Sequence, residues 1–269
     1  TYTYNSDGTC ASVTYAEGTN GVKKLNYIYN NKKQLVQTIA ILLDGSSHIL
    51  NEYTYTVDGK ISSRKDYKDI LNDTTNYILK NYTYDSFNRV LAMEYSEDNA
   101  LRTIKEKHSY QYDKASQILR EESSLNWEGQ SKAKKEVKNY KYDFKGQLIN
   151  SVVEDETQNQ ITTEYSYDSV GNRTEMIVST DKDKKKTTYQ YDDLNELLSS
   201  VLNNGSISSI TYTYDESGNL IKSMDEIKNV ETFYQYDSDG QMISYQSKVG
   251  GKDYLSQKNS YNGNGKRII

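Results

Sequence analysis

Residues that could carry chemistry are few and scattered in this chain of 269 residues. The two histidines, His48 and His108, lie 60 positions apart, and Cys10 is the single cysteine. Zinc sites need several Cys or His ligands at close spacing, so this set predicts no zinc site. Cys10 follows the Asp7-Gly8 turn, where a small buried hydrophobic residue is a better interpretation than a nucleophile.

Acidic residues beside glycine suggest two further kinds of chemistry, calcium binding and glycoside hydrolysis. Asp237-Ser-Asp239-Gly240 and Asn5-Ser-Asp7-Gly8 are the strongest candidates for a calcium loop. A loop of the EF-hand type needs more ligands in register and a terminal Glu, whereas Asp stabilises turns without any ion. Paired carboxylates can also hydrolyse glycosides, but each such Asp lies where a turn requires it. We therefore predict no metal, no cofactor and no enzyme activity.

Tyrosine is the residue type that a binding function would use. The chain has 27 Tyr against 3 Phe and 1 Trp. Rings in register can stack on sugars, so a carbohydrate- or protein-binding module at the cell surface is the alternative function. Cross-strand aromatic pairs also stabilise a sheet by about 0.2–1 kcal/mol each, and this structural interpretation is the one we favour.

Charge and hydropathy exclude two classes of partner. The net charge is −5 and the pI is 5.3, whereas nucleic-acid binding needs a basic face. No apolar run approaches the length of a membrane-spanning helix, so we predict no membrane insertion. The densest charge cluster, Asp181-Lys-Asp-Lys-Lys-Lys186, is expected at a solvated hairpin tip. Trp127 lies near another predicted tip, where it packs on a neighbouring arm or contacts a ligand.

One short unit recurs along the whole chain: Tyr-x-Tyr-Asp-x-x-Gly followed by a polar and then an apolar residue. Its second tyrosine falls at positions 4, 29, 55, 84, 112, 142, 167, 191, 214, 236 and 261, at intervals of 22 to 30 residues. We number these repeats 1 to 11. The clearest copies begin at Tyr212 and Tyr234. The structural motif residues of repeats 4 to 10 are Tyr82, Tyr84, Asp85, Tyr110, Tyr112, Asp113, Tyr140, Tyr142, Asp143, Gly146, Tyr165, Tyr167, Asp168, Gly171, Tyr189, Tyr191, Asp192, Tyr212, Tyr214, Asp215, Gly218, Tyr234, Tyr236, Asp237 and Gly240.

The unit has the chemistry of a β-hairpin. Residues i and i+2 of a strand share a face, so both tyrosines lie on one side of a sheet. Asp or Asn is preferred at the first position of a type I turn, and Gly or Asn accepts the left-handed backbone that closes it. Two strands of about seven residues and two turns add up to about 23 residues, close to the shortest intervals.

The array therefore predicts an all-β fold of about ten consecutive hairpins in a curled or spiralling antiparallel sheet. We expect residues 1–269 to be a single array of about 11 units, truncated at both ends, with an unpaired edge strand at each. Longer units near Asp44-Gly45 and Trp127-Glu128 predict longer arms in the N-terminal half. The absence of Pro fits, because Pro would remove ladder hydrogen bonds.

The repeated unit resembles the YD repeat, also called the Rhs repeat, of bacterial polymorphic toxins and wall-associated proteins. The same repeat occurs in the B and C components of insecticidal Tc toxins and in animal teneurins. The resemblance covers essentially the whole chain. It implies a β-strand spiral that builds a hollow shell around a C-terminal toxin or a folded chain end.

The resemblance thus implies a non-catalytic structural segment, secreted or on the surface of a bacterium, that encloses or presents a toxin or effector. Its partners would be the rest of its own longer chain: further repeats and a C-terminal toxin or effector. Eleven repeats are fewer than such shells generally need, which implies an open arc. The Asp-Pro-rich segment that ends the family's core has no counterpart here, and Thr56 and Lys33 depart from the motif.

Overall fold

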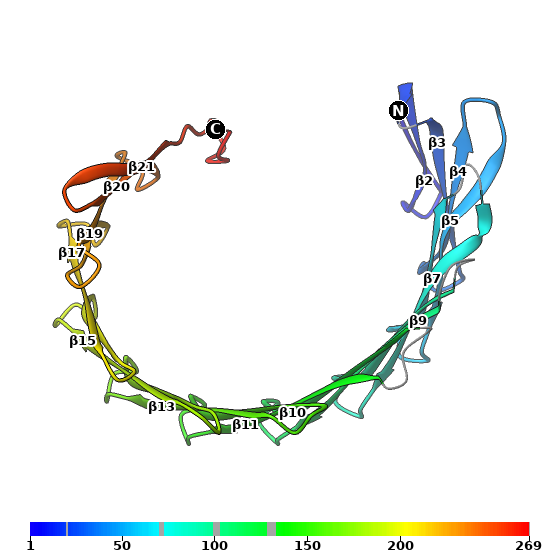
Figure 1. The fold of residues 1–269 in the computed structure, drawn as a ribbon. Coiled ribbons are helices and arrows are strands. Elements are labelled where there is room, and N and C mark those ends of the chain that lie inside the picture. Colours follow the sequence, from blue (N-terminus) through cyan, green and yellow to red (C-terminus); the bar gives the residue numbers. More distant parts are fainter. Residues whose placement is uncertain (20, 70–72, 99–102, 128–132, 269) are drawn as a thin grey trace. The chain divides into compact units, whose positions relative to one another are not determined.

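The computed structural model describes residues 1–19, 21–69, 73–98, 103–127 and 133–268, and this part of the chain is all β (Figure 1). Its strands, in chain order, are β1 (Tyr2–Tyr4), β2 (Cys10–Thr19), β3 (Val22–Tyr29), β4 (Leu35–Leu42), β5 (Ser47–Tyr55), β6 (Ile61–Asp69), β7 (Asp73–Tyr84), β8 (Val90–Asp98), β9 (Thr103–Tyr112), β10 (Ile118–Trp127), β11 (Lys134–Tyr142), β12 (Leu148–Asp155), β13 (Gln160–Tyr167), β14 (Arg173–Ser179), β15 (Lys184–Tyr191), β16 (Leu197–Asn203), β17 (Ile207–Tyr214), β18 (Leu220–Asp225), β19 (Val230–Tyr236), β20 (Met242–Val249) and β21 (Lys252–Lys258). None of the described residues forms a helix that could span a membrane.

The chain divides into two compact units. Unit 1 comprises Thr1–Asn139 and Glu154–Gln158, and unit 2 comprises Tyr140–Val153 and Asn159–Ile269. In unit 1 every strand from β1 to β11 pairs antiparallel with the next one. In unit 2 the same is true from β13 to β21. The predicted all-β fold of tandem antiparallel hairpins is confirmed.

The turn that follows the second tyrosine has one geometry in all eleven repeats. In repeat 4, Asp85 N donates to Arg89 O at 2.9 Å and Asn88 N donates to Asp85 O at 3.0 Å, and the other ten turns repeat both bonds. The fourth turn residue always has a positive φ, including the two non-standard residues Lys33 (61°) and Ser116 (66°). A left-handed backbone is thus imposed by the hairpin even where neither Gly nor Asn occupies the position.

A bulge follows each of these turns and sets the register of the returning strand. In repeat 3, Tyr55 pairs with Ile61 and Thr54 with Ser63, so Ser62 has no partner of its own across the hairpin. The same shift occurs at Tyr4, Tyr29, Tyr84, Tyr112, Tyr167, Tyr191, Tyr214 and Tyr236. The extra residue shifts the register of the returning strand by one position relative to the Tyr-x-Tyr strand.

The opposite edge of the sheet carries the second set of turns. They join β16 to β17, β18 to β19 and β20 to β21, for example. The arms are longer in the N-terminal half, as predicted: β7 has 12 residues and β18 has 6. One prediction is partly wrong, because the tip within the Asp181–Lys186 cluster spans residues 180–183. Lys184, Lys185 and Lys186 already belong to β15, since strand pairing continues to Ser179↔Lys184.

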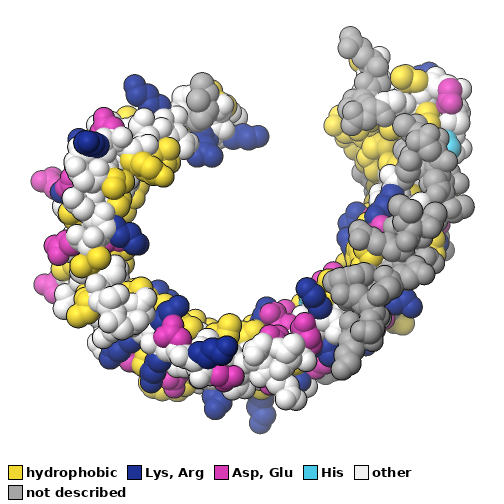
Figure 2. Space-filling model, in the orientation of Figure 1, with side chains coloured by type: hydrophobic (Ala, Val, Ile, Leu, Met, Phe, Trp, Pro, Cys, Tyr) yellow, Lys and Arg dark blue, Asp and Glu magenta, His cyan; other side chains and the backbone are white. Residues whose placement is uncertain are grey.

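Burial is slight throughout the described residues, so there is no conventional core. The buried apolar side chains there are Ala40 and Leu42, and no large side chain is fully buried. Figure 2 shows hydrophobic side chains interleaved with charged ones on the visible surface. Each hairpin is therefore stabilised mainly by its neighbours, as in other repeat proteins.

Candidate functional site

The tyrosine pairs form one face of the sheet. They end β7, β9, β11, β13, β15, β17 and β19, each motif Asp opens the following turn, and each motif Gly is its fourth residue. In repeat 3, Tyr53 and Tyr55 are half-buried, whereas Thr54 between them is exposed on the other face. We name the side that carries the pairs the tyrosine face.

The second tyrosine of a pair joins its repeat to the preceding one. Its hydroxyl donates a hydrogen bond to the backbone carbonyl of the residue that pairs with the preceding repeat's second tyrosine. Tyr55 Oη, for example, lies 2.6 Å from Leu35 O, and Leu35 pairs with Tyr29. Bonds of this kind include Tyr29–Cys10 (3.1 Å), Tyr55–Leu35 (2.6 Å), Tyr84–Ile61 (2.8 Å), Tyr112–Val90 (2.7 Å), Tyr167–Leu148 (2.8 Å), Tyr191–Arg173 (3.1 Å), Tyr214–Leu197 (3.1 Å) and Tyr261–Met242 (2.9 Å).

Burial makes several of the second-tyrosine hydroxyls less acidic. Desolvation is the main cause that raises the pKa of the second tyrosine, and this holds for Tyr29, Tyr55, Tyr84, Tyr112, Tyr167, Tyr191, Tyr214 and Tyr236. A raised pKa keeps the hydroxyl protonated, and only the protonated form can donate to a carbonyl.

The motif carboxylates hold the turns. Asp215 Oδ1 accepts from Ser217 N and Asn219 N, both at 2.9 Å, and Asn219 Nδ2 donates to Asp215 Oδ2 at 3.0 Å. The hydrogen bond from the Asn219 side chain is the largest of the contacts that lower the pKa of Asp215. Thr56, which replaces the Asp in repeat 3, uses its Oγ1 to accept from Lys60 N at 3.1 Å.

A second contact between repeats involves the residue just after each turn. Gln34 Nε2 donates to Gly59 O in the next repeat at 3.2 Å. A Cβ on Gly59 would lie 3.0 Å from this Gln34 nitrogen, and Gly171 is crowded in the same way by Gln147 at 3.3 Å. The next glycine thus supplies both a positive φ and room for the preceding side chain.

This contact has a sequence signal that the Tyr-x-Tyr-Asp-x-x-Gly motif does not include. Wherever Gln or Glu follows the turn, the fourth turn residue of the next repeat is Gly; the five pairs are Gln34–Gly59, Gln117–Gly146, Gln147–Gly171, Glu196–Gly218 and Gln241–Gly265. The four repeats whose fourth residue is not Gly follow Thr9, Lys60, Arg89 and Asn172. Two of these four donate to the next turn's side chain instead: Arg89 Nη1 to Ser116 Oγ at 3.2 Å and Asn172 Nδ2 to Asn195 Oδ1 at 2.8 Å.

The residues considered for chemistry lie apart from one another. His48 Nε2 is 3.1 Å from Ser46 Oγ, and His108 Nε2 is 2.7 Å from Glu106 Oε1. Cys10 is free and half-buried, with its Sγ 3.7 Å from Ser12 O. Among the described residues, no group of three His, Cys, Asp or Glu side chains could hold a metal ion. Trp127 ends β10, and its side chain lies outside the described part.

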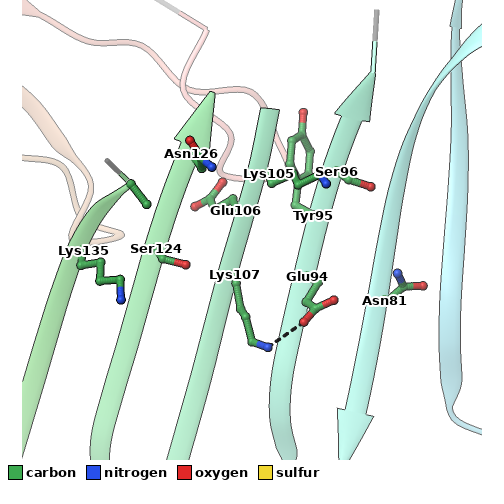
Figure 3. Close-up of a pocket in the computed structure, with 11 residues that line it drawn as sticks. Asn81, Glu94, Tyr95, Ser96, Lys105, Glu106, Lys107, Ser124, Asn126 and Lys135 are labelled. Carbon is green, nitrogen blue, oxygen red and sulfur yellow. Dashed lines mark ion pairs between the residues drawn. The ribbon is translucent and has the colours of Figure 1, made fainter. Parts of the chain in front are cut away.

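The face opposite the tyrosines carries a polar basin in unit 1 (Figure 3). It has a volume of 460 Å³ and lies across β7 to β11. Lys107 Nζ pairs with Glu94 Oε1 at 2.8 Å, and Lys105 and Lys135 also line the basin. These side chains are distributed along an open sheet surface, so they supply polar contacts and no enclosed reaction site.

A compact cluster lies on β5, β6 and β7 of unit 1. Tyr67 Oη donates to Glu52 Oε2 at 2.8 Å, and the rings of Tyr67 and Tyr77 are 5.9 Å apart. Lys65 Nζ lies 4.0 Å from the Tyr77 ring centroid. Burial, and then the bond to Glu52, raise the pKa of Tyr67 to about 12. This cluster stabilises the long arms of β5 to β7.

The family model for the Teneurin YD-shell matches residues 23–268. The chain belongs to the Teneurin YD-shell family. No curated protein sequence matches the chain. Among solved structures, the YD-shell chain is similar to the structure described as "Crystal Structure of TcdB2-TccC3-Cdc42", with a TM-score of 0.56 and 15% identity over 96% of this chain.

The matched structure is much longer than this chain, which covers 15% of its length. Because the sequence identity is only 15%, this similarity supports a shared fold and nothing further. A porin-like protein from Bacteroides uniformis ATCC 8492 also matches, at 13% identity over 70% of this chain and 91% of its own. Its TM-score is 0.38, which is too low to indicate a shared fold. The resemblance to YD-repeat proteins inferred from the motif is confirmed by the family match.

Proposed function

We propose that residues 1–269 form a single array that serves as a non-catalytic wall segment of a YD shell. In this proposal the strip of hairpins curls and is continued by further repeats of a longer chain. It encloses or presents a toxin or effector of that chain, in a secreted or surface protein of a bacterium. Membership of the Teneurin YD-shell family and the fold shared with a Tc toxin structure support this function.

The observation that carries the proposal is the use of the motif side chains. The second-tyrosine hydroxyls donate to the preceding repeat, and the carboxylates bind the turns. The hydroxyls connect consecutive hairpins and the carboxylates stabilise the turn of each hairpin, and a wall requires both. The glycan-binding alternative has less support, because hydroxyls that already donate to a carbonyl offer less to a sugar.

Limited proteolysis of the longer protein that contains this chain tests the proposal. Removal of residues 168–214 deletes two whole repeats between equivalent positions and should open the wall. We expect the segment after the repeats to be protected in the unaltered protein and cleaved in the deletion variant. Exchange of the exposed tip residues Asp181 and Lys182 for Gly and Ser is the matched control and should preserve protection. Equal sensitivity of that segment in all three proteins would overturn the proposal.

A further inference from the structure

Three hairpin tips of unit 2 present large apolar side chains to solvent. Phe144, Val170 and Leu194 are 95%, 72% and 77% exposed. They lie in the turns after β11, β13 and β15, which belong to repeats 6, 7 and 8. We name these three residues the apolar tip row.

The three tips are direct neighbours. Lys145 Nζ donates to Ser169 O at 2.8 Å, which joins the first tip to the second. Asn172 Nδ2 donates to Asn195 Oδ1 at 2.8 Å, which joins the second tip to the third. The apolar tip row is therefore a continuous feature of one edge of unit 2.

Hairpin folding does not require these apolar residues. The corresponding tips of repeats 9 and 10 carry Glu216-Ser217 and Ser238-Asp239, and they have the same turn hydrogen bonds. An apolar side chain at a solvated tip adds no stability to the hairpin. Neighbouring exposed apolar residues indicate a contact surface. The row therefore calls for a partner.

Spacing and charge select the partner. The tips of consecutive hairpins are separated by two strands, and hence by about 10 Å. The tips of a second copy of this chain have the same separation, so three tips of one copy can face three tips of the other. Lys145 lies beside Phe144 at one end of the row, and Asp193 lies beside Leu194 at the other. A two-fold axis through Val170 would place each Phe144 against the other copy's Leu194 and each Lys145 against the other copy's Asp193. A symmetric dimer is self-complementary in this way.

We propose that unit 2 binds a second copy of this chain through the apolar tip row, with the axis at Val170. This interaction is independent of any wall function. It also differs from pairing through an edge strand, for which β21 offers Tyr254 (76% exposed) and Leu255 (49% exposed). Variants of the tips and of the edge therefore separate the two modes of association.

Sedimentation equilibrium of the purified chain over a range of concentrations tests the proposal. We expect a dimer whose dissociation constant rises at least about tenfold in Lys145→Glu and in Asp193→Lys, because each places like charges together. The double variant restores the opposite charges and should dimerise again. Joint exchange of Phe144, Val170 and Leu194 for Ser should abolish the dimer.

Two controls carry matched changes elsewhere. Ile207→Ser removes an apolar residue with 62% exposure at the opposite edge, and Tyr254→Lys blocks edge pairing; both should leave the dimer intact. A chain that stays monomeric, a double variant that fails to recover, or a dimer lost only in Tyr254→Lys would overturn the proposal.

Discussion

The hydroxyl of Tyr55 donates a 2.6 Å hydrogen bond to the backbone carbonyl of Leu35, 20 residues earlier in the chain. Leu35 is the residue that pairs with Tyr29, the equivalent tyrosine of the preceding repeat. This one side chain therefore links two consecutive hairpins beside the residue that pairs with Tyr29. Because the acceptor is a backbone atom, the bond is preserved whether the acceptor residue is Leu, Ile, Val, Arg, Met or Cys.

Tyr55→Phe should lower the free energy of unfolding by about 1 kcal/mol, because it removes one hydrogen bond and leaves a carbonyl without this donor. Tyr53→Phe is the matched control in the same strand and on the same face. Tyr53→Phe should lower the free energy of unfolding by less, because it removes no hydroxyl bond to the preceding repeat. Urea unfolding followed by circular dichroism measures both values, and equal losses would contradict the role of the second hydroxyl.

Gly59→Ala should destabilise the chain more than Gly8→Ala. Both glycines have a φ near +87°, which costs an alanine about 1–2 kcal/mol. Only Gly59 has the Gln34 nitrogen 3.0 Å from the added Cβ, whereas nothing lies within 4 Å at Gly8. Thermal unfolding of Gly59→Ala, Gln34→Ala and the double variant should show that the extra cost disappears without Gln34. An additive pair would refute the crowding.

High pH should unfold the array. The folded-state pKa values of second tyrosines such as Tyr55 and Tyr84 are raised above 10.0, and that of Tyr67 reaches about 12. The folded state then binds more protons than the unfolded one, so this stability is fully present below pH 10 and is lost as the pH rises through the folded-state values. A titration of phenolate absorbance alongside circular dichroism should show ionisation and unfolding together. Stable strands after the buried tyrosines ionise would contradict the link.

Glu196 should be a pH-dependent weak point of unit 2. Burial, then the nearby charges of Asp192 and Asp215, raise its pKa, whereas Gln occupies the same place in repeats 2, 5, 6 and 10. A raised carboxyl pKa gives stability that is present at low pH and is lost as the pH rises through the folded-state value. Glu196→Gln should therefore raise the melting temperature at pH 7, and it should raise the melting temperature by a smaller amount at acidic pH. Gln241→Asn is a control at the equivalent position of repeat 10, where no carboxylate titrates in place of Glu196. A uniform gain for Glu196→Gln at every pH would contradict the electrostatic cause.

Much of the fold follows from the period of the repeat. Tyr-x-Tyr followed by Asp and Gly specifies a strand, a turn and a left-handed residue, and these were enough to predict consecutive hairpins. Lys33 and Ser116 show how strong the hairpin constraint is, because both adopt a positive φ that their own side chains disfavour. The single misplaced tip, at Asp181–Lys186, arose because a run of charge predicts a solvated loop, whereas Lys184 to Lys186 are exposed strand residues.

The connections between repeats were harder to predict. The tyrosine hydroxyl binds a main-chain carbonyl, and any residue type can supply that acceptor, so no side-chain pattern reveals it. The contact of Gln34 with Gly59 does leave a pattern, but it becomes visible only when positions in consecutive repeats are compared. The apolar tip row left a signal in Phe144, Val170 and Leu194, which the turn motif treats as unrestricted positions.

The most direct test of the wall function is a cryo-EM reconstruction of the complete protein that contains residues 1–269. Our account predicts that these hairpins form part of a wall, with the second tyrosines bonded to the preceding repeat and another segment of the protein enclosed by the wall. A reconstruction in which the hairpins form an isolated arm, with no segment enclosed or presented by them, would contradict it.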